Sequence, residues 1–283
     1  MLIPGVVIVF IFNYSPLYGL IIAFQDYNPA LGFSSPWIGM DNFRFVFNQP
    51  NFVRTIWNTL YIAAFKIIGG IIVPVTTALL LNEVRFLSVK RGFQTLMYLP
   101  YFLSWVIMAG ILIDVLSLDG IANTILMGIG FKPVQFLTNP AVFPWTMIVT
   151  DIWKNFGFSM VVFLAALAGI DPGLYEAAIV DGAGRWKQTW YITLPMIMPT
   201  VALISVLSLG DVLNAGFDQI YNLYSPIVFE TGDIIDTYVF RLGFQQAQYA
   251  VGTTVGMFKS LVSFILITLS YVLADKFTGY RVF

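Results

Sequence analysis

The sequence predicts an all-α polytopic membrane protein with six transmembrane helices. Of its 283 residues, 58% are hydrophobic and only 10% are charged, and the mean hydropathy is +0.82. A soluble globular protein has about 25% charged residues, so this composition excludes that class. Six apolar stretches are also long enough to cross a membrane, since a hydrocarbon layer of about 30 Å takes about 20 helical residues.

Three features of the whole sequence exclude large classes of function. Histidine and cysteine are both absent, which excludes disulfides, thiolate or imidazole metal sites and a Ser-His-Asp triad. The 14 basic and 15 acidic residues leave a net charge of −1 without a basic block, so no nucleic-acid partner is expected. No lysine follows a glycine, so the chain has no P-loop for ATP. We expect no catalytic residue, metal or cofactor in this chain.

The first half of the chain contains three predicted spans and one long connection. Met1 leads directly into the first apolar stretch without a basic segment or a cleavage site, so no removed signal peptide is expected. The connection 25–57 carries turn signals at Asn28-Pro29, Gly32 and Gly39. The predicted spans are Leu2–Phe24, Asn58–Leu81 and Leu96–Leu116.

The second half repeats this alternation of apolar stretches and connections. Its predicted spans are Pro144–Ala168, Pro195–Asn214 and Tyr249–Ala274. The connection 215–248 is the second long one, and within it Ile234–Phe244 has the pattern of a short amphipathic helix lying at the membrane surface.

The distribution of basic residues predicts the orientation. Seven Lys and Arg residues lie in the even-numbered connections and the tail, against four in the odd-numbered connections. Because cytoplasmic loops carry the excess of Lys and Arg, both termini are predicted to be cytoplasmic. The two long connections, 25–57 and 215–248, are then on the outer side.

The connection between spans four and five has the best-defined local structure. Asp171 is a good N-cap, and Pro172 occupies the first helical position, where a missing N–H costs nothing. Leu174, Ala177 and Ala178 would share one apolar face of the resulting helix. Gly182 and Gly184 then allow a chain reversal. The physical pattern alone fits any capped loop between two spans.

The spacing of this connection is more specific than its helix signals. It reads Glu176-Ala177-Ala178, three residues, Gly182, nine residues, Ile192, one residue, and Leu194-Pro195. This pattern resembles the cytoplasmic motif of permease subunits of binding-protein-dependent ABC importers. Further stretches resemble the oligosaccharide and polysaccharide branch of that family, and most of all the larger permease subunit of the alginate importers: Tyr14–Gly19, Ser35–Gly39, Asn58–Leu60, Leu81–Arg85, Gln94–Pro100 and Ile235–Val239.

The resemblance implies a type I ABC importer permease fold in the bacterial cytoplasmic (inner) membrane. In that family the loop is a coupling helix that docks into a groove of an ATPase subunit. Glu176, Ala177, Ala178 and Gly182 would shape this contact, and the return into span five would be set by Ile192, Leu194 and Pro195. The implied partners are a second homologous permease, a dimer of ATPase subunits that hold ATP and Mg²⁺, an extracytoplasmic solute-binding protein and membrane lipid.

The same resemblance divides the chain into three parts. Residues 1–57 would form the first transmembrane helix and an outer segment, 58–274 the importer transmembrane domain with its coupling loop 170–195, and 275–283 a cytoplasmic tail. In the outer region, the turn Gly216–Ile220 and the helix Ile234–Phe244 are candidate contacts for the solute-binding protein.

Charged and polar residues inside the spans mark the candidate substrate path, because each charge at the bilayer centre costs about 2.5 to 3.5 kcal/mol. Asp151 and Lys154 in span four are spaced to pair with each other. Lys66 and Lys259 could instead pair with Asp114 or Asp211. Asp151 and Asn155 lie one turn apart, and Trp153 offers a flat surface on which sugar rings can stack. We therefore place Asp151, Trp153 and Asn155 on the path.

Two other function classes remain open on the residues alone. One is a secondary transporter or channel in which Asp151, Lys154 and Asp211 relay protons or ions. It leaves the Glu176 to Pro195 spacing unexplained. The other is a membrane enzyme with paired carboxylates, but no two carboxylates share one face of a span at the required spacing.

Overall fold

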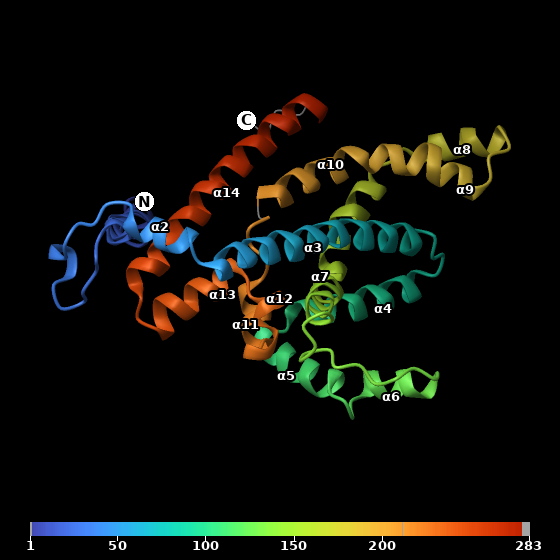
Figure 1. Cartoon of the computed structure of the whole chain (residues 1–283). Coiled ribbons are helices and arrows are strands. Elements are labelled where there is room, and N and C mark those ends of the chain that lie inside the picture. The colour runs from blue at the N-terminus through green and yellow to red at the C-terminus, as the bar shows by residue number, and fades with distance from the viewer. Residues whose placement is uncertain (1, 211, 279–283) are drawn as a thin grey trace.

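Helices make up nearly all of the described chain. The computed structural model describes residues 2–210 and 212–278 (Figure 1). The helices are α1 (Ile3–Val9), α2 (Asp41–Phe47), α3 (Pro50–Asn82), α4 (Leu87–Tyr98), α5 (Trp105–Leu116), α6 (Ile121–Gly128), α7 (Phe143–Ala168), α8 (Pro172–Val180), α9 (Arg185–Gln188), α10 (Leu194–Gly210), α11 (Phe217–Leu223), α12 (Phe229–Gly232), α13 (Ile235–Phe240) and α14 (Tyr249–Thr278). Within these residues, the only strand-like pairing is one bridge between Gln25 and Trp37.

The prediction of six membrane-spanning helices is confirmed. Six segments of the described chain are long and apolar enough to cross a bilayer, namely Ile3–Phe24, Pro50–Asn82, Trp105–Gly128, Phe143–Ala168, Arg185–Gly210 and Tyr249–Leu269. The first of them continues from α1 through a π-helical turn, Phe10–Tyr14, into a 3₁₀ segment, Ser15–Phe24. The second begins at Pro50, so the predicted domain boundary between residues 57 and 58 falls inside α3.

The third predicted span is wrong as a single helix. The chain leaves the α-helical path after Tyr98, makes a 3₁₀ turn over Leu99–Phe102 and starts a new helix at Trp105. Pro100 cannot donate its backbone nitrogen to the helix, and the Ser104 side chain accepts from the Ile107 N–H as a new N-cap. The segment that is long and apolar enough to cross a bilayer therefore begins at Trp105 and runs on through α6.

Helices α3 and α7 form the most extensive helix pair of the bundle. Near the start of α7, Ile62 of α3, Met147 of α7 and Ile220 of α11 are fully buried in one apolar cluster. Towards the α8 end, a second cluster contains Phe163 and Ile197. A third cluster joins α3 to α13 and α14. The interior thus runs along α3 from end to end.

The two ends of α3 separate the two kinds of connection. In Figure 1, α2 and the N-terminal loop lie beside the start of α3, whereas α8 and α9 lie beyond its other end. There Arg185 pairs with Glu83, the residue after α3, at 3.5 Å. The α3–α4 turn and the connection between spans four and five therefore share one end of the bundle.

Helix α13 lies in the interior, so the prediction that Ile234–Phe244 rests on the surface is wrong for its first half, whereas Phe244 at its end is 71% exposed. Ile234, Ile235 and Thr237 are 0% exposed. The helix packs against both α3 and α14. Thr237 bonds to the Asp233 carboxylate and Asp236 to Lys259 on α14, and such pairing allows polar groups to be buried. The neighbouring candidate docking turn is also largely internal, with Gln219 and Ile220 at 0% exposure.

Candidate functional site

Helix α8 begins as its sequence predicts. The Asp171 carboxylate accepts a hydrogen bond from the Gly173 N–H at 2.9 Å, and Pro172 occupies the first helical position. This bond satisfies one of the N–H groups that a helix start leaves without a partner. The N-terminal boundary is therefore fixed by side-chain chemistry.

The end of α8 depends on Gly182. The Ala183 N–H donates to the Ala178 carbonyl at 2.8 Å, and the Gly182 N–H donates to the Ile179 carbonyl at 3.0 Å. This pair of bonds is a Schellman motif, which needs a left-handed residue at the position of Gly182. Gly182 has φ +76°, a conformation that costs other L-residues about 1–2 kcal/mol. Both ends of α8 are thus capped.

Helix α8 offers an apolar surface and is tied to span five. Glu176, Ala177 and Gly182 are exposed, and Val180 is 87% exposed. On the inner side, the Tyr175 hydroxyl lies 3.0 Å from the Thr193 Oγ1.

The residues that follow α8 lead into span five through a π-helical turn over Thr189–Thr193. Ile192 and Leu194 pack against the buried cluster around Phe163, whereas Pro195 is exposed. The return from α8 into α10 is therefore anchored in the buried cluster.

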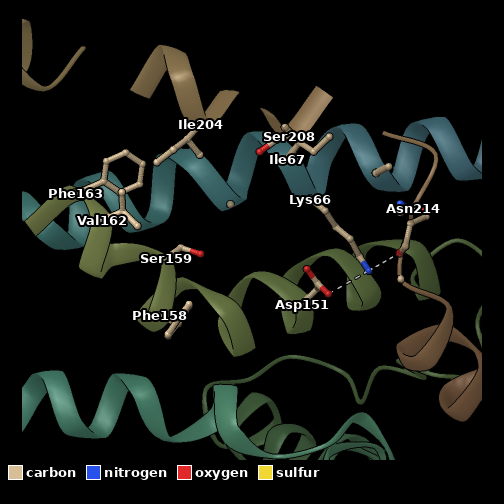
Figure 2. A pocket seen from close by; sticks show the side chains of 14 residues that line it. Lys66, Ile67, Asp151, Phe158, Ser159, Val162, Phe163, Ile204, Ser208 and Asn214 are labelled. Carbon is tan, nitrogen blue, oxygen red and sulfur yellow. Dashed lines mark hydrogen bonds and ion pairs between the residues drawn. The ribbon is translucent and has the colours of Figure 1, made fainter. Parts of the chain in front are cut away.

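A cavity of about 420 Å³ lies between α3, α7 and α10. Figure 2 shows Lys66 on α3, Asp151 and Ser159 on α7, and Ser208 on α10 around this space. The wall is otherwise mostly apolar, and the non-helical link between α10 and α11 closes it with Asn214, Ala215 and Gly216. A largely apolar hollow with a few polar groups is typical of a small-molecule site.

Lys66 is buried beside this cavity, and its ammonium has three partners within the protein. Its Nζ donates to the Ala215 carbonyl at 2.7 Å and to the Gln219 Oε1, and it lies 3.4 Å from the Asp151 Oδ1. Gln219 in turn donates to the Met147 carbonyl and the Thr150 hydroxyl, both at 2.8 Å. Gly216 has φ +95°, and an added Cβ there would lie 2.9 Å from the same ammonium, so a larger residue would be strained and would displace Lys66.

Span four therefore does not contain the predicted Asp151–Lys154 pair. The Lys154 Nζ instead donates to the Tyr101 carbonyl at 3.0 Å and lies 5.2 Å from the centre of the Trp105 ring. Asp151 pairs with Lys66 instead. Of the three predicted path residues, Asp151 lines the cavity, whereas Trp153 and Asn155 are not among its lining residues.

The last intramembrane lysine has a different partner from either one considered in the sequence. Lys259 on α14 donates to the Asp236 carboxylate on α13 at 2.5 Å and to the Asn214 Oδ1 at 2.8 Å. Asp114 and Asp211 were the sequence candidates for Lys66 and Lys259. The pair with Asp114 is not formed, and Asp211 lies outside the described residues.

The connection 215–248 contains another buried charge pair. Arg241 donates from Nη1 and Nη2 to the two oxygens of Asp233, and its guanidinium lies 4.3 Å from the centre of the Phe229 ring. Burial alone would lower the pKa of Arg241, but the hydrogen bonds and charge of Asp233 outweigh burial and raise that pKa. The guanidinium therefore stays charged.

Comparison with known proteins identifies the family. Residues 67–279 match the family described as "Binding-protein-dependent transport system inner membrane component". The chain belongs to this family. The match covers the cavity-lining helices from Ile67 onward, α8 and its return into span five. The resemblance predicted from the Glu176 to Pro195 spacing is thus confirmed.

Individual relatives match over nearly the full chain. Protein LplB of Bacillus subtilis (strain 168) is 42% identical over 279 residues, which is 98% of this chain and 88% of LplB. The polygalacturonan/rhamnogalacturonan transport system permease protein YteP of the same organism is 41% identical over 98% of this chain and 87% of YteP.

Solved structures agree. A chain of a bacterial ABC transporter involved in the import of the acidic polysaccharide alginate superimposes with a TM-score of 0.90 at 40% identity, covering 98% of this chain and 94% of that one. A chain of a bacterial alginate ABC transporter in complex with an alginate pentasaccharide-bound periplasmic protein superimposes with a TM-score of 0.89 at 39% identity. This match covers 98% of this chain and 93% of that one.

The predicted type I permease fold is therefore confirmed, and the chain is a transport component. The alternative of a secondary transporter is not supported by membership in a binding-protein-dependent family. In the permease, Asp151 is paired with Lys66, and Lys154 donates to the Tyr101 carbonyl rather than to Asp151.

Proposed function

We propose that this permease forms one half of an ATP-driven importer for an oligosaccharide or polysaccharide. A second homologous permease supplies the other half, an extracytoplasmic solute-binding protein delivers the sugar, and a dimer of ATPase subunits holds ATP and Mg²⁺. The single observation that carries the proposal is α8: a doubly capped helix with an exposed apolar face, attached to span five by Tyr175 and Thr193.

The ATPase contact is assigned to the exposed end of the bundle. Glu176, Ala177 and Ala178 lie on α8 and Gly182 ends it, so these residues form the docking surface in this proposal. Ile192, Leu194 and Pro195 direct the return into α10. Because this end carries the larger number of basic residues, we place it and both termini in the cytoplasm of a bacterium, with the chain in the inner membrane.

The cargo class follows from the relatives and from the cavity. The similar proteins are named for an acidic polysaccharide and for polygalacturonan or rhamnogalacturonan. The cavity of about 420 Å³ combines apolar walls with hydroxyl, amide and carboxylate groups, which suits sugar rings and their hydroxyls. Alginate oligosaccharides are therefore the first substrates to test.

The test of coupling replaces Gly182 by aspartate. Gly182→Asp puts a side chain at φ +76°, which costs about 1–2 kcal/mol. It also puts a negative charge at the C-terminal, negative end of the α8 dipole, which destabilises the helix further. We expect the ATPase to be lost when the tagged permease is purified from its native membrane, and sugar uptake to fall at least tenfold while the second permease remains bound.

Gly184→Asp is the matched control. Gly184 is an N-cap with φ −68°, a position that aspartate favours, so this variant should keep both the ATPase and uptake. Full uptake in Gly182→Asp would contradict the coupling role. Purification of the wild-type permease without an ATPase would contradict the importer itself.

A further inference from the structure

The cavity wall contains a cation that is not available to a ligand. An ammonium has three donors, and those of Lys66 face Ala215, Gln219 and Asp151. Within the described residues, no other Lys or Arg lines the cavity. Lys154, which lies on the same helix as Asp151, is directed to Tyr101 and Trp105 instead.

The carboxylate of Asp151, unlike the Lys66 ammonium, is available to a ligand. One oxygen faces Lys66, and 22% of the side chain is exposed. The other oxygen accepts no hydrogen bond from the described part of the chain, and Figure 2 shows the side chain projecting from α7 towards α3 beside the cavity. A carboxylate with a free oxygen is a strong acceptor.

Lys66 also fixes where this acceptor lies. Because its ammonium is held by the Ala215 carbonyl and by Gln219, it keeps Asp151 in one position without offering a donor of its own. The hydroxyls of Ser159 and Ser208 line the same cavity. This wall therefore offers a ligand one fixed charged acceptor, the Asp151 carboxylate, and otherwise only the neutral hydroxyls of the two serines.

We infer that Asp151 is a specificity-determining residue that accepts hydrogen bonds from sugar hydroxyls and disfavours a sugar carboxylate at this wall. The inference rests on the proposed sugar import and refines it. A neutral sugar presents hydroxyl donors on all sides, whereas a uronate presents a second anion that Asp151 repels. A uronate chain passes with its hydroxyl edge towards α7 and its carboxylates towards the opposite wall.

The test compares two cargoes of one shape in the complete importer. The first is a uronate trisaccharide, and the second is the same trisaccharide with its carboxylates reduced to alcohols. Uptake of each is measured in liposomes for wild type and for Asp151→Asn. The binding protein is identical in all reactions, so its own preference cancels between variants.

Asp151→Asn removes the charge but retains an amide oxygen for Lys66. We expect the ratio of uronate to neutral uptake to rise about tenfold, because the neutral sugar loses a charged acceptor and the uronate loses a repelling charge. Asp151→Glu keeps the charge and should keep the wild-type ratio. Asp236→Asn makes the same change in the Lys259 pair, away from the cavity lining, and should also keep it.

An unchanged ratio in Asp151→Asn, with uptake retained, would overturn the inference and leave sugar import intact. Wild-type liposomes that take up neither trisaccharide would instead remove the proposed function. If Asp151→Asn does not assemble, binding of both trisaccharides to the purified wild-type permease pair decides the question. Tighter binding of the neutral one supports the inference, and tighter binding of the uronate overturns it.

Discussion

The buried Asp233–Arg241 pair should be the most sensitive charge pair to break in the connection 215–248. Their side chains are 5% and 17% exposed, and Asp233 also accepts from the Thr237 hydroxyl at 2.7 Å. Asp233→Ala would leave a buried guanidinium beside Phe229 without its bidentate acceptor. Removing one partner of a buried pair costs about 3–5 kcal/mol. Because Arg241 is partly exposed, we expect a loss at the lower end, about 3 kcal/mol.

The assay is thermal unfolding of the purified permease in detergent, followed by tryptophan fluorescence. At about 2–4 °C per kcal/mol for a chain of this size, Asp233→Ala should lower the Tm by about 6–12 °C. The control is Asp41→Ala, since the Asp41 and Arg44 side chains are 63% and 78% exposed and such pairs contribute about 0–1 kcal/mol. Equal, small shifts for both variants would refute the reasoning.

Two further substitutions test the packing of the bundle. An added Cβ on Gly157 would overlap the Met97 carbonyl, so Gly157→Ala should separate α7 from α4 and lower the Tm. The control is Gly92→Ala, because an added Cβ there meets no described atom within 4 Å. This control should raise the stability of the permease by up to about 1 kcal/mol. Fully buried Asn123 bonds to three backbone groups of the segments that flank α6, so Asn123→Ala should cost about 1–3 kcal/mol in the same assay. Thr124→Ala, whose hydroxyl bonds only within α6, is its control, and equal Tm values for the two would contradict the role of Asn123.

Local signals were sufficient to predict that the chain has six spans, and to predict the ends of α8. Hydropathy identifies a membrane helix because the bilayer requires a continuous apolar stretch of fixed length. Asp171, Pro172 and Gly182 define a helix through bonds to their own neighbours. The break near Pro100 was also signalled by proline, but the apolar composition around it favoured one continuous span.

Partner choice among buried polar groups was not predictable in this way. Asp151 and Lys154 have the spacing of a pair on one helix, yet Asp151 pairs across to α3 and Lys154 caps a backbone carbonyl of another segment. Likewise Ile234–Phe244 has an amphipathic pattern because its polar side chains bond internally, which sequence periodicity cannot distinguish from exposure to water.

The partners of Lys66 also have a consequence for biosynthesis. Lys66 lies in the second span, but the carbonyl that holds it belongs to Ala215, 149 residues later in the sequence. While the chain is being made, this span meets the lipid with an ammonium whose acceptors have not left the ribosome, at a cost of about 2.5–3.5 kcal/mol. Lys259, by contrast, is translated after both of its acceptors, Asp236 and Asn214. Of the two lysines, only Lys66 needs its helix to wait near the translocon or beside another protein until the later spans are made.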